Sequence, residues 1–248
     1  AGTSNFRAGV NAGNSIESGG NYNVVVGDDA GTAITTGDAN TAVGVESLAS
    51  NTTSDYNTAT GYRALLSNTT GASNTAVGGL ALDANTTGDA NVAMGVNALG
   101  ANTTANNNTA VGKDSLKVNT TGANNTAVGK SALDACTTGG SNTALGADAL
   151  SSDTLGSRNV AIGTSALEVQ NFTSATNSYN VAIGFNAGAA VTTGINNTIM
   201  GGLAGDAITT ASSNTALGYF ALGGASLASA NTAVGSGALA AHNVGSLA

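Results

Sequence analysis

Small apolar and polar residues alternate in a pentapeptide, Asn-x-Ala-x-Gly, that recurs along most of the chain. Successive copies are 17 residues apart, except for a step of 18 after a weaker first copy at Asn5 and a step of 21 after Asn159. The clear copies begin at Asn23, Asn40, Asn57, Asn74, Asn91, Asn108, Asn125, Asn142, Asn159, Asn180, Asn197, Asn214 and Asn231. Such a period predicts a solenoid of stacked coils. We expect a single all-β domain over residues 1–248, a parallel β-solenoid (β-roll) of about 14 coils of 17 residues, with a four-residue insertion within 168–179.

We number each coil from the motif Asn, which is position 1. Positions 2 and 4 carry Thr or an aliphatic residue, and position 3 is usually Ala. Alternate residues of a strand face opposite sides, so we expect positions 2 and 4 to point into the coil and position 3 to point outward. An outward column of methyl groups suggests a close partner. We therefore expect self-association through the Ala column, with a second inward-facing wall as the alternative: Ala42, Ala59, Ala76, Ala93, Ala110, Ala127, Ala144 and Ala161.

The second half of each coil predicts further walls and corners. Gly at position 5 suits a corner with positive φ. Position 9 is a Leu column that we expect in the core, as at Leu116. Four coils have Gly there instead, and three residues later a β-branched residue restores the lost volume. These pairs are Gly13 with Ile16, Gly31 with Ile34, Gly188 with Val191, and Gly205 with Ile208.

Position 12 predicts a ladder of stacked Asn side chains, each hydrogen-bonded to its equivalents above and below. Its members are Asn51, Asn68, Asn85, Asn102 and Asn119. The next two coils carry Cys136 and Asp153 in this column, so we interpret Cys136 as a substituted ladder position rather than a catalytic thiol.

The 21-residue step brings three aromatic residues together in or near the insertion, Phe172, Tyr179 and Phe185. One interpretation is a protruding loop that contacts a ligand. The other is a tolerated bulge whose aromatics cover a gap.

Composition limits the classes of function. Only 4% of residues are aromatic and 36 are Gly, which favours a thin core. A net charge of −8 argues against nucleic-acid binding. No apolar run approaches the roughly 20 residues of a membrane span, so we expect no membrane insertion. The chain starts without Met, which suggests a processed product or an excised fragment.

Candidate chemistry is sparse. The single His, His242, has no evident triad partners, so we expect no enzyme activity and no cofactor. An isolated Ca²⁺ site at Asp28 and Asp29 stays open as an alternative. Paired Thr residues at positions 13 and 14, such as Thr69 and Thr70, raise a second alternative, an ice-binding array.

The copies Asn-Thr-Ala-Val-Gly, Asn-Val-Ala-Ile-Gly and Asn-Thr-Ala-Leu-Gly resemble the Asn-Ser-Val-Ala-Ile-Gly repeats in the heads of trimeric autotransporter adhesins (YadA-like heads). The longer form is similar to 17-residue repeats of phage and virus tail-fibre proteins. The resemblance implies a left-handed β-roll, homotrimeric in the adhesins, at an extracellular, cell or virion surface. A cell-surface or glycan receptor would then be a partner.

The two ends predict assembly. We find no capping element and expect the chain to hold whole coils, so we expect the end coils that carry Asn5, Asn231 and His242 to pair head-to-tail. The alternative is that the ends are cuts within a longer repeat protein. The sequence thus predicts a non-enzymatic structural protein of an extracellular fibre or filament, with adhesion as a further role. An ice-binding solenoid and a receptor-binding tail-fibre shaft are the alternatives.

Overall fold

The computed structural model describes residues 4–224 and 228–241, and within them the chain is all-β, with no helix. The strand pairs are parallel and follow the 17-residue repeat, which confirms a parallel β-solenoid. Internal contacts divide the chain into two units, Ala1–Asn124 and Asn125–Ala248, which we describe separately. Handedness stays a prediction.

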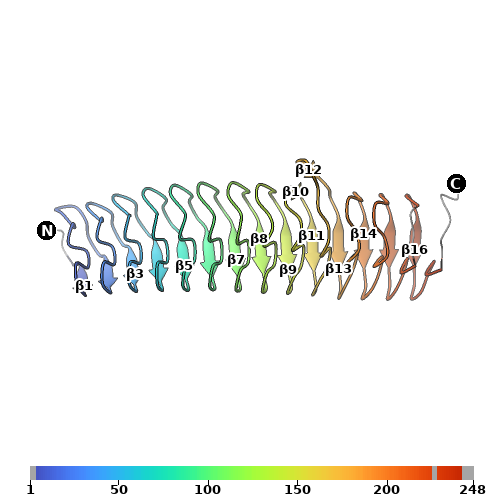
Figure 1. Cartoon of the computed structure of the whole chain (residues 1–248), viewed down its shortest axis with the longest axis horizontal. Coiled ribbons are helices and arrows are strands. Elements are labelled where there is room, and N and C mark those ends of the chain that lie inside the picture. The colour runs from blue at the N-terminus through green and yellow to red at the C-terminus, as the bar shows by residue number, and fades with distance from the viewer. Residues whose placement is uncertain (1–3, 225–227, 242–248) are drawn as a thin grey trace. The chain divides into compact units, whose positions relative to one another are not determined.

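Unit 1 contains one strand per coil, and neighbouring strands lie side by side (Figure 1). Equivalent residues pair in register, as Thr41 does with Thr58 and Ala42 with Ala59. Its strands are β1 (Phe6–Ala8), β2 (Val24–Val26), β3 (Thr41–Val43), β4 (Thr58–Thr60), β5 (Thr75–Val77), β6 (Val92–Met94) and β7 (Thr109–Val111).

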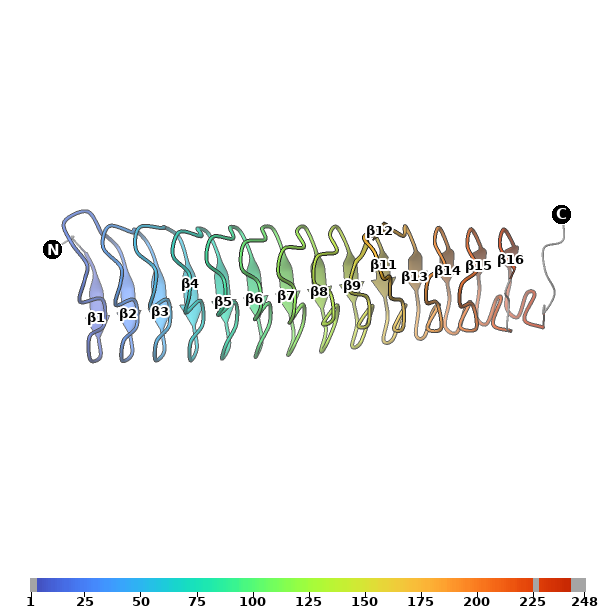
Figure 2. The same ribbon diagram turned by 45° about the horizontal axis from the view of Figure 1, so that its top comes forward.

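Unit 2 has the same parallel arrangement of main strands (Figure 2), and it adds a short second sheet at the insertion. Its main strands are β8 (Thr126–Val128), β9 (Thr143–Leu145), β11 (Val160–Ile162), β13 (Val181–Ile183), β14 (Thr198–Met200), β15 (Thr215–Leu217) and β16 (Thr232–Val234). The second sheet pairs β10 (Gly156–Ser157) with β12 (Thr176–Asn177). The loop that carries β12 rises above the neighbouring turns in Figure 1.

The core of each coil is narrow. In the coil of β4 it contains Ala59 at position 3 and Ala64 and Leu65 at positions 8 and 9, all at 0% exposure. Position 1 is also buried, as at Asn57. Since positions 1 and 3 lie on the same side of a strand, the methyl group of Ala shares the inner wall with the Asn side chain.

The expected direction of the strand side chains is therefore wrong. Thr109 and Val111 are partly exposed, whereas Ala110 between them is buried. The physical reason is space and hydrogen bonding: position 1 must point inward for its amide to reach the backbone across the coil, and only a small residue fits beside it and the Leu of the opposite wall. The inward direction of Leu116 is confirmed.

The self-association expected through the Ala column is corrected by the same observation. Each of these residues has 0% exposure within the chain, so the column is the second inward-facing wall and offers no surface to a partner. This applies to Ala42, Ala59, Ala76, Ala93, Ala110, Ala127, Ala144 and Ala161.

Gly at position 5 is required by backbone conformation and by the neighbouring coil. Gly44 has φ 131°, and a Cβ on it would lie 2.5 Å from the carbonyl oxygen of Gly61 in the next coil. L-residues rarely adopt this φ. The corner predicted from the sequence is thus confirmed, and its tight stacking explains why the motif ends in Gly.

The exchange of volume between positions 9 and 12 is confirmed. Gly31 adopts φ 52°, and a Cβ on it would come within 2.8 Å of Cδ1 of Ile34. Ile34 and Ile208 are both fully buried. Each of these β-branched side chains occupies core space that Leu fills in the other coils.

Two ladders of Asn side chains connect the coils. At position 12, Nδ2 of Asn68 donates to Oδ1 of Asn51 at 3.0 Å and to the carbonyl of Gly71 at 2.8 Å. At position 1, Oδ1 of Asn40 accepts the backbone N–H of Asn57 at 2.9 Å, and its Nδ2 donates to the carbonyl of Ser54 at 2.9 Å. The first ladder confirms the prediction. The second is the reason that the motif begins with Asn, because buried backbone groups need partners.

Candidate functional site

The side chains at positions 2 and 4 form an outward sheet face. In unit 2 the position 4 column is apolar throughout, whereas five of the seven residues at position 2 are Thr. Leu145 and Leu217 are each 45% exposed, and Val234 is 64% exposed. Because the strands pair in register, equivalent side chains lie in two straight columns. The outward sheet face of unit 2 consists of Thr126, Thr143, Val160, Val181, Thr198, Thr215 and Thr232 at position 2, and Val128, Leu145, Ile162, Ile183, Met200, Leu217 and Val234 at position 4.

Unit 1 presents the same two columns with a similar composition. Val24 and Met94 are exposed, whereas Thr60 replaces the aliphatic residue at position 4 of its coil. Its face comprises Val24, Thr41, Thr58, Thr75, Val92 and Thr109, and Val26, Val43, Thr60, Val77, Met94 and Val111.

No charged residue occurs at positions 2 to 4 of the clear copies from Asn23 onward. Large apolar side chains are also exposed just after the Gly corner, at position 6, where Phe185 is 58% and Tyr219 61% exposed. Isolated exposed apolar residues are normal, but contiguous apolar surface marks an interaction site. The outward sheet face is therefore the main candidate functional surface, and the sequence argument missed it. The side that position 3 faces follows from the burial of Asn at position 1, which only the structure shows.

The Thr pairs at positions 13 and 14 do not form a free hydroxyl array. At position 13 the hydroxyl donates to a carbonyl of the next coil, as Thr69 Oγ1 does to Thr86 at 3.0 Å and Thr192 Oγ1 to Thr209 at 3.2 Å. Position 14 is the more exposed member, as at Thr87. Half of this expected ice-binding array is thus engaged in holding coils together.

The acidic residues also have structural partners. Oδ1 of Asp55 accepts the backbone N–H of Asp38 at 2.7 Å, and Oδ1 of Asp89 accepts that of Ala72 at 2.7 Å. Asp28 accepts the N–H of Val10 at 3.0 Å, and Asp29 accepts from Asn11 Nδ2 at 3.0 Å. Among the residues that the structure describes, no three His, Cys, Asp or Glu side chains cluster as metal ligands would.

The insertion does not present its aromatics together. Phe172 is buried, which contradicts its interpretation as an exposed ligand contact and agrees with the alternative, a bulge whose aromatics cover a gap. Tyr179 is exposed and accepts a hydrogen bond from Arg158 Nη1 at 2.8 Å, with the guanidinium 5.6 Å from its ring centroid. Phe185 follows β13, outside the insertion.

A buried polar group supports the insertion from below. Oδ2 of Asp153 accepts from Gln170 Nε2 at 2.7 Å, and Oδ1 accepts the N–H of Gly156 at 2.9 Å. Oε1 of Gln170 accepts from Asn180 Nδ2 at 2.7 Å. Burial raises the pKa of Asp153 above its ordinary value, although the Gln170 and Gly156 donors lower it. Asp153 and Gln170 therefore take the place of Asn in the position 12 ladder, next to the coil that carries the insertion.

Cys136 occupies the ladder position as predicted. Its Sγ lies 3.4 Å from the carbonyl oxygen of Gly139, and burial, with a smaller contribution from Asp153, raises the pKa of the thiol to about 12. A nucleophilic cysteine needs a lowered pKa, so this environment favours an inert side chain.

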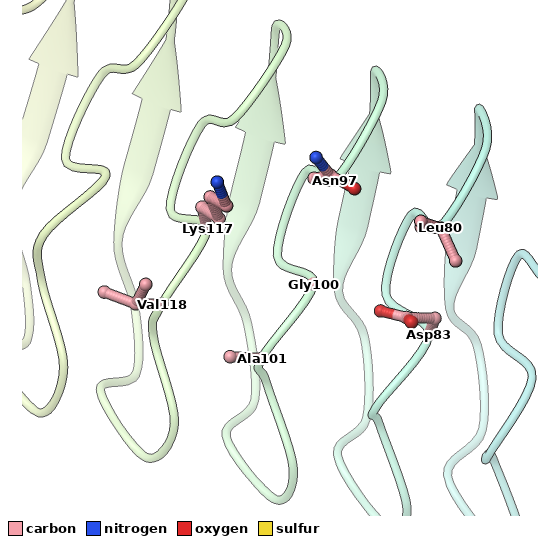
Figure 3. Close-up of a pocket in the computed structure, with 7 residues that line it drawn as sticks. All are labelled: Leu80, Asp83, Asn97, Gly100, Ala101, Lys117 and Val118. Carbon is pink, nitrogen blue, oxygen red and sulfur yellow. The ribbon is translucent and has the colours of Figure 1, made fainter.

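A shallow groove of about 270 Å³ crosses three coils of unit 1 (Figure 3). Gly100 leaves a gap between Asp83 and Lys117, which flank it in the neighbouring coils, and Leu80 and Val118 add apolar walls. The groove is open to solvent and contains no convergent set of reactive groups.

The residues expected at the coil ends are held within their own stack where the structure describes them. Asn5 Oδ1 accepts the N–H of Asn23 at 2.8 Å, and Asn231 Nδ2 donates to Asn214 Oδ1 at 3.1 Å. His242 lies outside the described residues.

No protein-family model matches the chain, and neither does any curated protein. The resemblance to YadA-like heads and tail-fibre repeats therefore stays a prediction from the motif. Within residues 4–224 and 228–241 there is no helix that could span a membrane.

Proposed function

We propose that this chain is a non-enzymatic structural protein of an extracellular fibre or filament, at a cell or virion surface, which associates with copies of itself. The observation that carries the proposal is the use of its polar side chains. The Asn ladders, the position 13 Thr hydroxyls and the Asp carboxylates bond to neighbouring coils instead of converging on a site. A chain built in this way is suited to rigidity and to presenting a regular surface. The location is supported by the motif resemblance alone.

The test is direct observation of the purified protein. Negative-stain electron microscopy and sedimentation should show assemblies larger than one chain, as a filament or a homotrimer. Labelled antibody should also reach the protein on intact cells or virions of its source. A protein that stays monomeric at all concentrations, or that is reached only after permeabilisation, would contradict the proposal.

Adhesion is the finer part of the proposal, in which the assembled surface binds a cell-surface or glycan receptor. Labelled protein applied to a glycan array and to host cells would test it. Binding by the isolated chain would favour the receptor-binding shaft over a purely structural filament.

Ice binding is a second candidate, and the position 2 column is the observation that favours it. Thr41, Thr58 and Thr75 repeat outward in register on a parallel sheet without charge. This array differs from the Thr pairs at positions 13 and 14. Thermal hysteresis of the purified protein would show this activity, and its absence at millimolar concentration would exclude it.

A further inference from the structure

We infer that four exposed asparagines are sites for N-linked sugar and that the chain has to fold before it meets the enzyme that attaches it. The four are Asn107, Asn124, Asn171 and Asn196, each the first residue of an Asn-x-Thr acceptor sequence. The chain contains nine such sequences, and the other five begin at the ladder residues Asn51, Asn68, Asn85, Asn102 and Asn119. The inference rests on the proposed surface location, because Asn-x-Thr acceptors belong to proteins that leave the cytosol.

In the exposed acceptor sequences, the Asn and the Thr lie at the surface together. Asn107 is exposed and Thr109 partly exposed, whereas Asn108 between them is buried. The same alternation occurs in 171–173 and 196–198, where both outer residues are exposed and the middle one is buried. A transferase has to recognise the amide and the hydroxyl of one acceptor sequence together. In these segments both groups reach solvent on the folded chain.

Position 17, which three of the four sites occupy, has room for a large substituent. Other coils carry Tyr22 and Tyr56 there, with 66% and 67% of their surface exposed. A side chain of that size therefore projects into solvent from this corner. Asn107 has the left-handed φ of 59° that this corner imposes, which Asn tolerates better than most residues. A sugar on its amide would be solvated and would contact no part of the core.

The transfer itself is a substitution at the anomeric carbon of a phosphate-activated sugar. A bond forms between that carbon and Nδ2 of Asn, the bond from the carbon to the phosphate oxygen breaks, and one amide proton passes to the transferase. The modified amide keeps its oxygen as an acceptor. At Asn171 this oxygen accepts from Thr154 Oγ1 at 2.8 Å, a bond that the sugar leaves in place.

The ladder asparagines cannot carry a sugar in the folded chain. Asn68 and Asn85 have 0% exposure. Nδ2 of Asn85 donates to Oδ1 of Asn68 at 2.8 Å and to the carbonyl of Gly88 at 3.0 Å, so both amide protons are engaged. A sugar would remove one of these bonds from the interior and would need space that a close-packed core does not have. Modification and folding therefore exclude each other at the ladder positions.

The order of events follows from the repeat. A ladder Asn is covered only when the neighbouring coils are in place, because a single coil cannot bury its own core. A transferase that acts during translocation would meet Asn51 or Asn68 before those coils have formed, and would modify Asn-Thr-Thr there as it modifies Asn-Asn-Thr at Asn107. The chain must therefore reach its surface by a route on which folding comes before any sugar transfer.

The experiment directs the whole chain, behind a removable leader, into the secretory pathway of cultured animal cells, where Asn-x-Thr is modified during translocation. The ladder variant loses its five buried acceptor sequences but keeps every ladder Asn, through Thr53→Val, Thr70→Val, Thr87→Val, Thr104→Val and Thr121→Val. These Thr are exposed, and Leu155 shows that position 14 accepts an aliphatic residue. The matched control loses the four exposed acceptors instead, through Thr109→Val, Thr126→Val, Thr173→Val and Thr198→Val.

The ladder variant should be secreted in a folded form, at least about tenfold more abundantly than the parent or the control. Peptide mass mapping should find its sugar on the exposed asparagines. Blocking synthesis of the lipid-linked sugar donor should restore secretion of the unmodified parent without any substitution. Made in the bacterial cytosol, where this transfer does not occur, all three proteins should share one circular dichroism spectrum and melt within a few degrees of each other.

Several results would overturn the inference. One is a parent secreted as well as the ladder variant, whether or not its ladder asparagines carry sugar. Another is a parent that stays inside the cell when donor synthesis is blocked, because its retention would then not be due to sugar. A secreted ladder variant with no sugar at any of the four exposed positions would remove the assigned sites. Self-association is measured separately on the cytosolic protein, so failure of the inference and failure of the proposed function remain distinguishable.

Discussion

At the residue scale, the motif is a set of separate steric and hydrogen-bonding requirements. Position 1 must be Asn because its side chain bonds both within its coil and to the next one, as Asn40 does. Position 3 is small where Leu fills position 9, whereas the larger Val25 and Ile199 are buried in coils that have Gly there. Position 5 must be Gly because a Cβ would meet the next coil. Because all three requirements repeat in every coil, a change at one residue acts on two neighbouring coils.

Gly44→Ala should be strongly destabilising. The new Cβ would lie 2.5 Å from the Gly61 carbonyl oxygen, at a φ of 131° that L-residues rarely adopt. We expect a loss of about 2–4 kcal/mol in the free energy of unfolding, measured by urea denaturation. Gly79→Ala is the matched control, because a Cβ added there would have no neighbouring atom within 4 Å, and it should change stability by less than about 1 kcal/mol. Equal effects would contradict the steric explanation.

Asp153→Asn should stabilise unit 2 and remove part of its pH dependence. Burial raises the folded-state pKa of Asp153, so the folded state binds the proton more tightly than the unfolded state. Ionisation therefore costs stability as pH rises through the folded pKa, and this cost is absent below the unfolded value of about 3.9. An Asn amide could also donate to the Gly156 carbonyl, as Asn68 does to Gly71, which adds about 1 kcal/mol.

The measurement is thermal unfolding of parent and variant between pH 4 and pH 8. The advantage of the variant should be smallest near pH 4 and should grow with pH. A constant difference across the range would show that Asp153 does not titrate between the two states.

At the element scale, residues that face the inside of a coil contribute much more to the stability of the fold than residues that face outward. Leu116 and Val111 belong to the same coil, but the first is fully buried and the second partly exposed. Leu116→Ala should cost about 2–5 kcal/mol by leaving a cavity, whereas Val111→Ala should cost less than about 1 kcal/mol in a monomeric sample. Chemical denaturation of both variants would check this. A larger cost for Val111 would restore the inward assignment that the structure contradicts.

The sequence was sufficient to predict the coils but not to predict which side chains of each strand face the core. The 17-residue period, the Asn ladder at position 12 and the Gly-to-Ile exchange at Gly31 and Ile34 all followed from repetition and volume. The side that each residue faces did not follow from them, because Thr, Val and Ala at positions 2 to 4 are compatible with either side of a strand on hydrophobicity alone. The deciding fact was the buried hydrogen bonding of Asn at position 1, which is a three-dimensional relation. For Phe172 the sequence left two interpretations open, and its burial agrees with a bulge whose aromatics cover a gap.

At the scale of the whole molecule, the repeat predicts that coils contribute to stability mainly through their nearest neighbours. Removing residues 57–73 deletes one complete coil and joins Tyr56 to Asn74, so that the coils of β3 and β5 become adjacent. Their Asn, Gly and Leu columns remain in register. We expect this shortened chain to fold with the β-type circular dichroism of the parent and a melting temperature lower by only a few degrees.

Removing residues 57–64 alone should have a much greater effect, although fewer residues are lost. Tyr56 would then be joined to Leu65, so that Leu would stand at position 1, where Asn is required. The Asn ladders at positions 1 and 12 would both be interrupted. Unit 1 should then lose cooperative unfolding and become sensitive to protease. If this shorter deletion melted like the complete-coil deletion, the register of the Asn and Gly columns would not be what holds the solenoid together, and the stability would have to arise within single coils.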